Sequence, residues 1–239
     1  MKSKIGDWFE YDWPIEGKTA RFAVDLAHKY AGKTDEYPYL FFVNCASKKK
    51  IGLSERFKIR LFANHLKLMI EPMYVGSIKT KKQVQYYFYA KSNAMLDEAK
   101  ALAKKQRSLR CRVDCIHEPM WDTYFNVLCP DDAKKQTEKN RETLELMEKH
   151  GYSLSSTRRI SLHMYFPSEP KLLEFAEAAR LGGFAIGDTE FMPEQTLPHG
   201  IIIIHLSSLR KKEIDDITTR AIVLAKQYGG TLNYWDCPK

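Results

Sequence analysis

Four residues near the middle of the chain have side chains that bind zinc, but their spacing argues against a shared ion. They are Cys111, Cys115, His117 and Cys129, and thiolates that share a zinc ion at bonds of ~2.3 Å lie within ~4 Å of each other. The alternation in RCRVDCIH predicts a strand, in which residues four positions apart are separated by about 13 Å. Cys111 and Cys115 are therefore expected to be buried apolar thiols, while Cys115 with His117 stays open as a pair. We expect no metal site and no cofactor.

Phosphate-binding and catalytic motifs are incomplete. Gly-Lys-Thr occurs at residues 17–19 and 32–34, but a phosphate loop needs another glycine five positions before, where this chain has an aspartate and an alanine. We interpret both triplets as turns. Gly-x-Ser-x-Gly, Ser-x-x-Lys and His-Glu-x-x-His do not occur, and the carboxylate pair Glu118 and Asp122 is of a kind that any surface turn can have. The sequence favours a protein that is not an enzyme; an enzyme for a small molecule stays open, because catalytic residues often converge from distant positions.

The composition is that of a globular protein. The 239 residues include 38 Lys+Arg against 30 Asp+Glu, a net charge of +8, and 44% are apolar, which excludes a disordered, collagenous or coiled-coil chain. The longest apolar run, residues 200–206, is far shorter than the roughly 20 residues of a membrane-spanning helix. Asp7 and Glu10 interrupt the start of the chain, where a signal peptide would be apolar. We expect a cytoplasmic protein that does not bind a membrane and whose five cysteines are reduced.

Charge and composition divide the chain in two. Residues 1–132 hold 23 basic and 16 acidic side chains, whereas residues 133–239 hold 15 and 14. The polar stretch from Cys129 to Gln136 separates the two parts. The sequence therefore predicts two domains, a basic one at residues 1–132 and a second one at residues 133–239.

The second half predicts a helix followed by β-α-β-β-α-β. A helix over 137–150 precedes an alternating strand over 159–166, a helix that begins after Ser168 and ends at Gly182, and strands over 184–191 and 200–207. A helix over 214–228 and a strand over 231–236 complete the order. Two crossover helices on one face of a four-stranded antiparallel sheet make the ferredoxin-like arrangement.

The same half resembles a known family. The fragments that carry the resemblance lie between Glu138 and Trp235, in order: ETLELMEKHG, ISLHMYF, FAEAARLGGFAIGDTE, GIIIIHLSSL and LAKQYGGTLNYW. They resemble the bacterial RraB family, the regulators of ribonuclease activity B, which inhibit ribonuclease E. The resemblance implies a small protein without enzymatic activity that binds an endoribonuclease and lowers its activity.

The first half predicts the same order after an added hairpin. Strands over 7–13 and 19–26 flank a turn, and a strand over 38–44, a helix over 53–70, a second hairpin, a helix over 93–107 and a strand over 110–117 follow. We therefore expect a second ferredoxin-like domain with an extra hairpin. The fragments WFEYDWPIEGK, PYLFFV, YVGSIKT, YYFYA and EPMWDTYFNVLCP also resemble an uncharacterised bacterial domain family that often precedes an RraB-like domain.

The open face of the second sheet is the candidate protein-binding site. In the ferredoxin-like order the first and third strands are neighbours, so Ser161, His163 and Tyr165 are expected beside Ile201, Ile203 and His205, with Trp235 on the edge strand. Aromatic side chains supply most interface hot spots, which favours a protein partner. The alternative is that this face packs against the first domain or a second copy of the chain. The predicted face residues are Ser161, His163, Tyr165, His205 and Trp235.

The basic first half raises a second candidate, a nucleic-acid-binding site. Tyr39, Phe41, Tyr86 and Phe88 lie on predicted strands that could stack RNA bases, although the basic-Gly-aromatic run of RNA-binding sheets is missing. Clustered lysines at the predicted loops would contact phosphates. These lysines are Lys48, Lys49, Lys50, Lys79, Lys81 and Lys82.

The sequence thus predicts an α+β protein of two ferredoxin-like domains. The favoured function is a binding and regulatory module without enzymatic activity, by resemblance a regulator of RNA turnover that binds a ribonuclease. The alternatives are a nucleic-acid-binding protein that uses the basic first domain, and an unrecognised enzyme for a small molecule. The expected partner is a protein; RNA and a second copy of the chain stay open.

Overall fold

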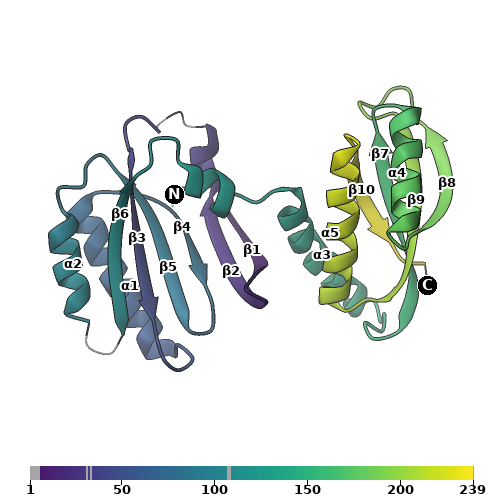
Figure 1. Cartoon of the computed structure of the whole chain (residues 1–239). Coiled ribbons are helices and arrows are strands. Elements are labelled where there is room, and N and C mark those ends of the chain that lie inside the picture. The colour runs from purple at the N-terminus through teal and green to yellow at the C-terminus, as the bar shows by residue number, and fades with distance from the viewer. Residues whose placement is uncertain (1–5, 31, 33, 107–108, 239) are drawn as a thin grey trace, which may run out of the picture. The chain divides into compact units, whose positions relative to one another are not determined.

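A computed structural model describes residues 6–30, 32, 34–106 and 109–238 of the chain. The chain divides into two compact units, Met1–Pro130 and Asp131–Lys239, which are described separately (Figure 1). Both combine helices with an antiparallel sheet, so the predicted α+β class is confirmed. None of the described helices is both long and apolar enough to cross a membrane.

Unit 1 is built on a six-stranded sheet with the strand order β1-β2-β4-β5-β3-β6. The predicted hairpin joins one edge of this sheet, because β2 pairs with β4. Its turn needs positive φ at two successive residues, which Glu16 (48°) and Gly17 (73°) provide. We interpret the remaining four strands, with their two connecting helices, as the predicted β-α-β-β-α-β plan. The elements are β1 (Trp8–Ile15), β2 (Lys18–Asp25), η1 (Leu26–Tyr30), β3 (Tyr39–Ala46), α1 (Leu53–Ile70), β4 (Met73–Lys79), β5 (Gln83–Ala90), α2 (Leu96–Lys104), β6 (Arg110–His117) and η2 (Thr123–Leu128).

Both faces of this sheet carry a hydrophobic core. On one face, side chains of β3, β5 and β6 pack with Phe62 and Leu66 of α1 and Ala99 of α2. On the other face, residues of β1, β2 and β4 pack with Trp121 and Tyr124, which belong to the irregular segment around η2. This segment follows the last strand and covers the second face, and its sequence has no periodicity that predicts a helical element.

Unit 2 has a four-stranded sheet with the order β10-β7-β9-β8, and every neighbouring pair is antiparallel. Its core lies between the sheet and the helices α4 and α5, and α3 packs on α5. We interpret this order too as the predicted β-α-β-β-α-β plan, with the first and third strands at the centre. The elements are α3 (Asp132–Lys149), β7 (Thr157–Phe166), α4 (Glu169–Leu181), β8 (Ala185–Phe191), β9 (His199–Ser208), α5 (Lys211–Gln227) and β10 (Thr231–Asp236).

Several helix ends differ from the predicted ones, and α5 begins at Lys211, three residues before its predicted start. Helix α3 begins at Asp132, five residues before the predicted start, because the carboxylate of Asp131 accepts the backbone N–H of Lys134 at 2.9 Å and caps the first turn. Helix α2 spans only Leu96–Lys104, and the predicted end at residue 107 lies outside the described residues.

Candidate protein-binding face

The central strand β7 presents Ser161, His163 and Tyr165 on the side of the unit 2 sheet that faces away from the helices. Their direct partners on β9 are Ile204, Ile202 and Gly200. We call this side of the sheet the open face; α3, α4 and α5 lie on the other side (Figure 1).

The predicted neighbours of these three residues are wrong by one position of strand register. Ile201 pairs with Met164 and Ile203 with Leu162, and all four side chains are buried in the core below α4 and α5. Since side chains alternate between the faces of a sheet, a slip of one residue moves a whole row to the opposite face.

His205 and Trp235 also lie on the helix side, which corrects their predicted place on the open face. His205 pairs with Ile160 and makes an edge contact with the ring of Phe184 at 5.6 Å. Trp235 pairs with Leu162, is 7% exposed, and donates its indole N–H to Oδ1 of Asn140 at 2.8 Å.

A bulge in β10 explains the position of Trp235. The pairing of β10 with β7 shifts between Leu232 and Tyr234, so the alternation of side chains changes by one residue beyond this point. Tyr234 and Asp236 therefore occupy the open face beside His163 and Ser161. Neither residue was among the predicted site residues, and a bulge leaves no periodic signal in the sequence.

Two polar pairs fix side chains on the open face. The ring of His163 stacks on Tyr234 with centroids 4.0 Å apart, and its Nε2 lies 2.7 Å from Oδ2 of Asp236. Tyr165 donates its hydroxyl to Oε1 of Glu190 at 2.6 Å. Burial and, next, this hydrogen bond raise the pKa of Tyr165 to about 12.

Gly200 makes the second pair feasible. It lies on β9 between Tyr165 and Glu190, its register partners on either side. A Cβ at this position would lie 2.6 Å from Cγ of Glu190 and 3.0 Å from Cε1 of Tyr165. The missing side chain therefore lets the two partners meet across the strand.

The surface offered to a partner comes mainly from side chains that flank the centre. Ser161 and Tyr165 are buried, at 7% and 9% exposure, whereas Tyr234 is 47% and Leu206 is 69% exposed. Ile202 and Ile204 are half-buried between them. Exposed apolar and aromatic side chains beside fixed polar groups are suited to protein binding.

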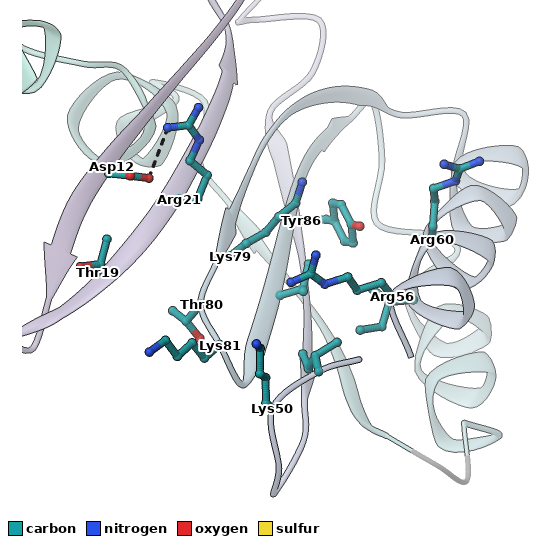
Figure 2. A pocket seen from close by; sticks show the side chains of 13 residues that line it. Asp12, Thr19, Arg21, Lys50, Arg56, Arg60, Lys79, Thr80, Lys81 and Tyr86 are labelled. Carbon is teal, nitrogen blue, oxygen red and sulfur yellow. Dashed lines mark hydrogen bonds and ion pairs between the residues drawn. The ribbon is translucent and has the colours of Figure 1, made fainter. Parts of the chain in front are cut away.

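The predicted lysines of unit 1 fall into two groups. Lys50, Lys79 and Lys81 line a pocket of about 550 Å³, which Arg21, Arg56 and Arg60 also line (Figure 2). The other three, Lys48, Lys49 and Lys82, are exposed and do not line it. The arginines were missed because they come from β2 and α1, although the spacing of Arg56 and Arg60 on the predicted helix places both on one face.

The predicted RNA-stacking platform is wrong. Phe41 and Phe88 are buried in the core that packs against α1 and α2, and Tyr39 and Tyr86 pack on the same cluster. Base stacking needs aromatic rings on an uncovered face of the sheet.

The cysteines do not gather into a metal site. Cys111 and Cys115 pack on the helix side of the unit 1 sheet, whereas Cys129 belongs to the core on the opposite side. Cys45 is the direct strand partner of Cys111, and the hydrogen bond between them together with burial raises the pKa of Cys45. No group of three metal-binding side chains occurs within the described part of the chain.

The remaining motifs have structural roles where the structure describes them. Gly17 forms the turn of the first hairpin, and the second Gly-Lys-Thr includes residue 33, which lies outside the described residues. Glu118 accepts the backbone N–H and the hydroxyl of Thr123 at 3.1 and 2.8 Å, and also the hydroxyl of Tyr89. This carboxylate therefore holds the segment before η2 in place.

Comparison with known proteins agrees with the two-part organisation. Residues 137–237, nearly all of unit 2, match the family described as Regulator of ribonuclease activity B. Residues 6–129 match the Family of unknown function (DUF695). Both resemblances seen in the sequence are confirmed, and the first connects the chain with the regulation of ribonuclease activity in general. No curated protein matches the chain. Because the match over residues 6–129 covers more than half of the sequence, the protein belongs to the family of unknown function DUF695, and it carries an RraB-type region in its second unit.

Proposed function

We propose that the protein is a regulator of RNA turnover without enzymatic activity, which binds a ribonuclease through the open face of unit 2. The observation that carries this proposal is the family match over residues 137–237, which spans the whole sheet of unit 2. The partner that the resemblance points to is ribonuclease E.

The exposed and ordered side chains of the open face support a protein partner. Tyr234 and Leu206 are the exposed large hydrophobic residues of the face, and such side chains lose water-exposed area when a partner covers them. The contacts of His163 with Tyr234 and Asp236 already fix the aromatic ring in one place. A side chain that is ordered before binding loses less conformational entropy in the complex.

A binding measurement with matched variants tests this proposal. The full chain is titrated against immobilised ribonuclease E after nuclease treatment, as wild type, as Leu206→Glu and as Leu173→Glu. Leu173 is 59% exposed on α4, on the other side of the sheet, so it controls for the added charge and for the loss of an exposed leucine. We expect Leu206→Glu to weaken binding at least about tenfold, a cost of about 1.4 kcal/mol, and Leu173→Glu to leave it unchanged.

The salt dependence of binding distinguishes a direct protein contact from a complex that is bridged by RNA. Raising NaCl from about 50 to about 200 mM weakens a complex that depends on several phosphate contacts by about 1,000-fold or more, whereas an apolar contact changes little. Equal losses for the two variants, or binding that disappears after nuclease treatment, would contradict the proposal. The wild-type protein could instead associate with itself and not bind the ribonuclease. If Leu206→Glu abolished this self-association, the open face would be assigned to a second copy of the chain.

A further inference from the structure

Unit 1 contains a basic pocket that the proposed function does not use. The pocket, of about 550 Å³, opens between the hairpin strands, the β4–β5 turn and the first turns of α1 (Figure 2). This volume is typical of a small-molecule site. Six cationic side chains line it: Arg21, Lys50, Arg56, Arg60, Lys79 and Lys81. We refer to this site as the basic pocket.

Most of this positive charge is not neutralised by the protein. Arg21 lies 3.2 Å from Glu10 and 3.3 Å from Asp12. Among the residues that the structure describes, the other five cations form no ion pair with a carboxylate. The six cations less these two carboxylates leave an excess of about four positive charges around one cavity, which attracts anions and raises their local concentration.

Two pairs of like charges meet at the basic pocket. Arg21 and Lys79 are direct partners on β2 and β4, and like charges in this position repel each other across a sheet. Arg56 and Arg60 are four residues apart on α1, where like charges are also unfavourable. Local conflicts of this kind are expected where a function compensates for them, and a bound polyanion would relieve both.

The loops that carry the lysines are held together by backbone hydrogen bonds. The N–H of Ile51 donates to the carbonyl of Lys81 at 2.9 Å, and the N–H of Ser47 donates to that of Lys82 at 2.9 Å. The hydroxyl of Thr80 accepts the N–H of Gln83 at 3.1 Å. Lys50 and Lys81 therefore stand on a fixed frame, which lowers the entropic cost of ordering them around a ligand.

The inner wall of the basic pocket is apolar. Ile51, Ile59 and Val84 are buried beneath the cations, with exposures of 3%, 1% and 7%. Tyr86 adds an aromatic ring; burial raises its pKa, and Arg60 is near enough to oppose this shift. Figure 2 shows Arg56 reaching from α1 toward Tyr86 and the strands. The pocket thus combines an apolar and aromatic wall with cations from several elements.

We propose that the basic pocket binds a nucleotide that carries two or more phosphate groups. Bidentate arginines and point-charge lysines recognise phosphates, and the half-buried ring of Tyr86 offers an aromatic surface for the base. The cations converge on one cavity from β2, β4, α1 and two loops, which fits a compact ligand better than an extended RNA backbone.

Calorimetric titration of the full chain tests this assignment. The probes are the four ribonucleoside triphosphates, adenosine monophosphate, inorganic pyrophosphate, and an RNA oligonucleotide without terminal phosphates. We expect at least one triphosphate to bind at least about tenfold more tightly than adenosine monophosphate, because further charge-assisted hydrogen bonds form. We expect the same triphosphate to bind more tightly than pyrophosphate, which has no base.

A matched pair of double variants locates the site. Arg56→Gln with Lys79→Gln removes two cations that line the basic pocket, whereas Lys48→Gln with Lys49→Gln removes the same charge from exposed positions beside Lys50 that do not line it. The first should weaken triphosphate binding about tenfold or more, and the second clearly less, because Lys48 and Lys49 do not line the cavity that holds the ligand.

Four results would overturn the proposal. They are no binding of any triphosphate, equal losses in both double variants, pyrophosphate binding as tight as the best triphosphate, and tighter binding of the RNA oligonucleotide through the same residues. The third result would indicate a simple anion site, and the fourth an RNA-backbone site.

Discussion

His163 and Tyr234 stack across neighbouring strands of unit 2, with ring centroids 4.0 Å apart and planes inclined by 16°. Their contact exists because a bulge in β10 moves Tyr234 to the open face and turns Trp235 toward the helices. The bulge thus places the two neighbouring aromatic side chains on opposite faces of the sheet. Trp235 anchors the core to α3, and Tyr234 forms part of the surface offered to a partner.

The anchor of Trp235 predicts a large effect for Asn140→Ala. Asn140 is fully buried on α3; its Oδ1 accepts the indole N–H of Trp235, and its Nδ2 donates to Asp215 and Thr218 at 2.9 Å each. Truncation removes these hydrogen bonds and leaves the buried indole N–H of Trp235 without its partner, so we expect the free energy of unfolding to fall by about 2–3 kcal/mol in urea titrations. Lys139→Ala, at an exposed neighbouring position, should change it by less than about 0.5 kcal/mol. Equal effects of the two variants would contradict the stabilising role of the hydrogen-bond network around Asn140.

The close packing around Gly230 predicts that a larger side chain there destabilises the fold. A Cβ at this position would lie 2.1 Å from the ring of Phe166, a fully buried core residue. Gly230→Ala should therefore lower the free energy of unfolding by about 1–3 kcal/mol, because the ring must move in a packed core. At Gly182 the nearest atom is a carbonyl oxygen 3.3 Å away, so Gly182→Ala should have a clearly smaller effect in the same thermal or urea unfolding experiment. A harmless Gly230→Ala would mean that Phe166 can repack freely.

The environment of Tyr165 predicts a loss of stability at alkaline pH. Burial and the hydrogen bond to Glu190 raise the pKa of Tyr165 from 10.0 to about 12. The unfolded chain then releases its phenol proton first, so the stabilisation is complete below pH 10 and is lost as the pH rises toward about 12. Other buried tyrosines add to the trend, and Tyr165→Phe should make the fall in unfolding free energy between these pH values less steep. An unchanged slope would show that the phenol of Tyr165 titrates normally.

The N-terminal cap of α3 is expected to stabilise unit 2 when this unit is produced as a separate fragment. We expect a fragment of residues 130–239 to fold by itself, because its core and α3 lie within the unit. A fragment that begins at residue 133, the boundary predicted from sequence, loses the capping carboxylate of Asp131. It should be less stable by about 1 kcal/mol, as measured by urea unfolding followed by circular dichroism. If neither fragment folds, the two units depend on each other.

Regular elements could be predicted from sequence with little error. The helix Leu53–Ile70 and the strand Arg110–His117 have the predicted bounds, because their apolar periodicity and flanking residues are local signals. The segment around Trp121 and Tyr124 could not be predicted, since it lacks a period and is held by packing on the sheet.

The candidate site could be predicted only in part, because register is not a local property. The alternation in β7 placed Ser161, His163 and Tyr165 on one face, but which residues of β9 stand opposite depends on the pairing of the two strands. His205 and Trp235 were misplaced for this reason and because of the bulge in β10. The basic pocket shows the same limit, since Arg21 and Arg56 come together only in the folded unit.

The most direct test of the regulatory function is the rate at which ribonuclease E cleaves a fluorescent RNA substrate in the presence of increasing amounts of the full chain. We predict that the wild-type protein lowers the rate in a saturable manner, and that Tyr234→Ala raises the concentration needed for half-maximal inhibition by about tenfold or more. Heat-denatured protein serves as the control. A cleavage rate that stays constant at every concentration of a folded, wild-type protein would contradict the account.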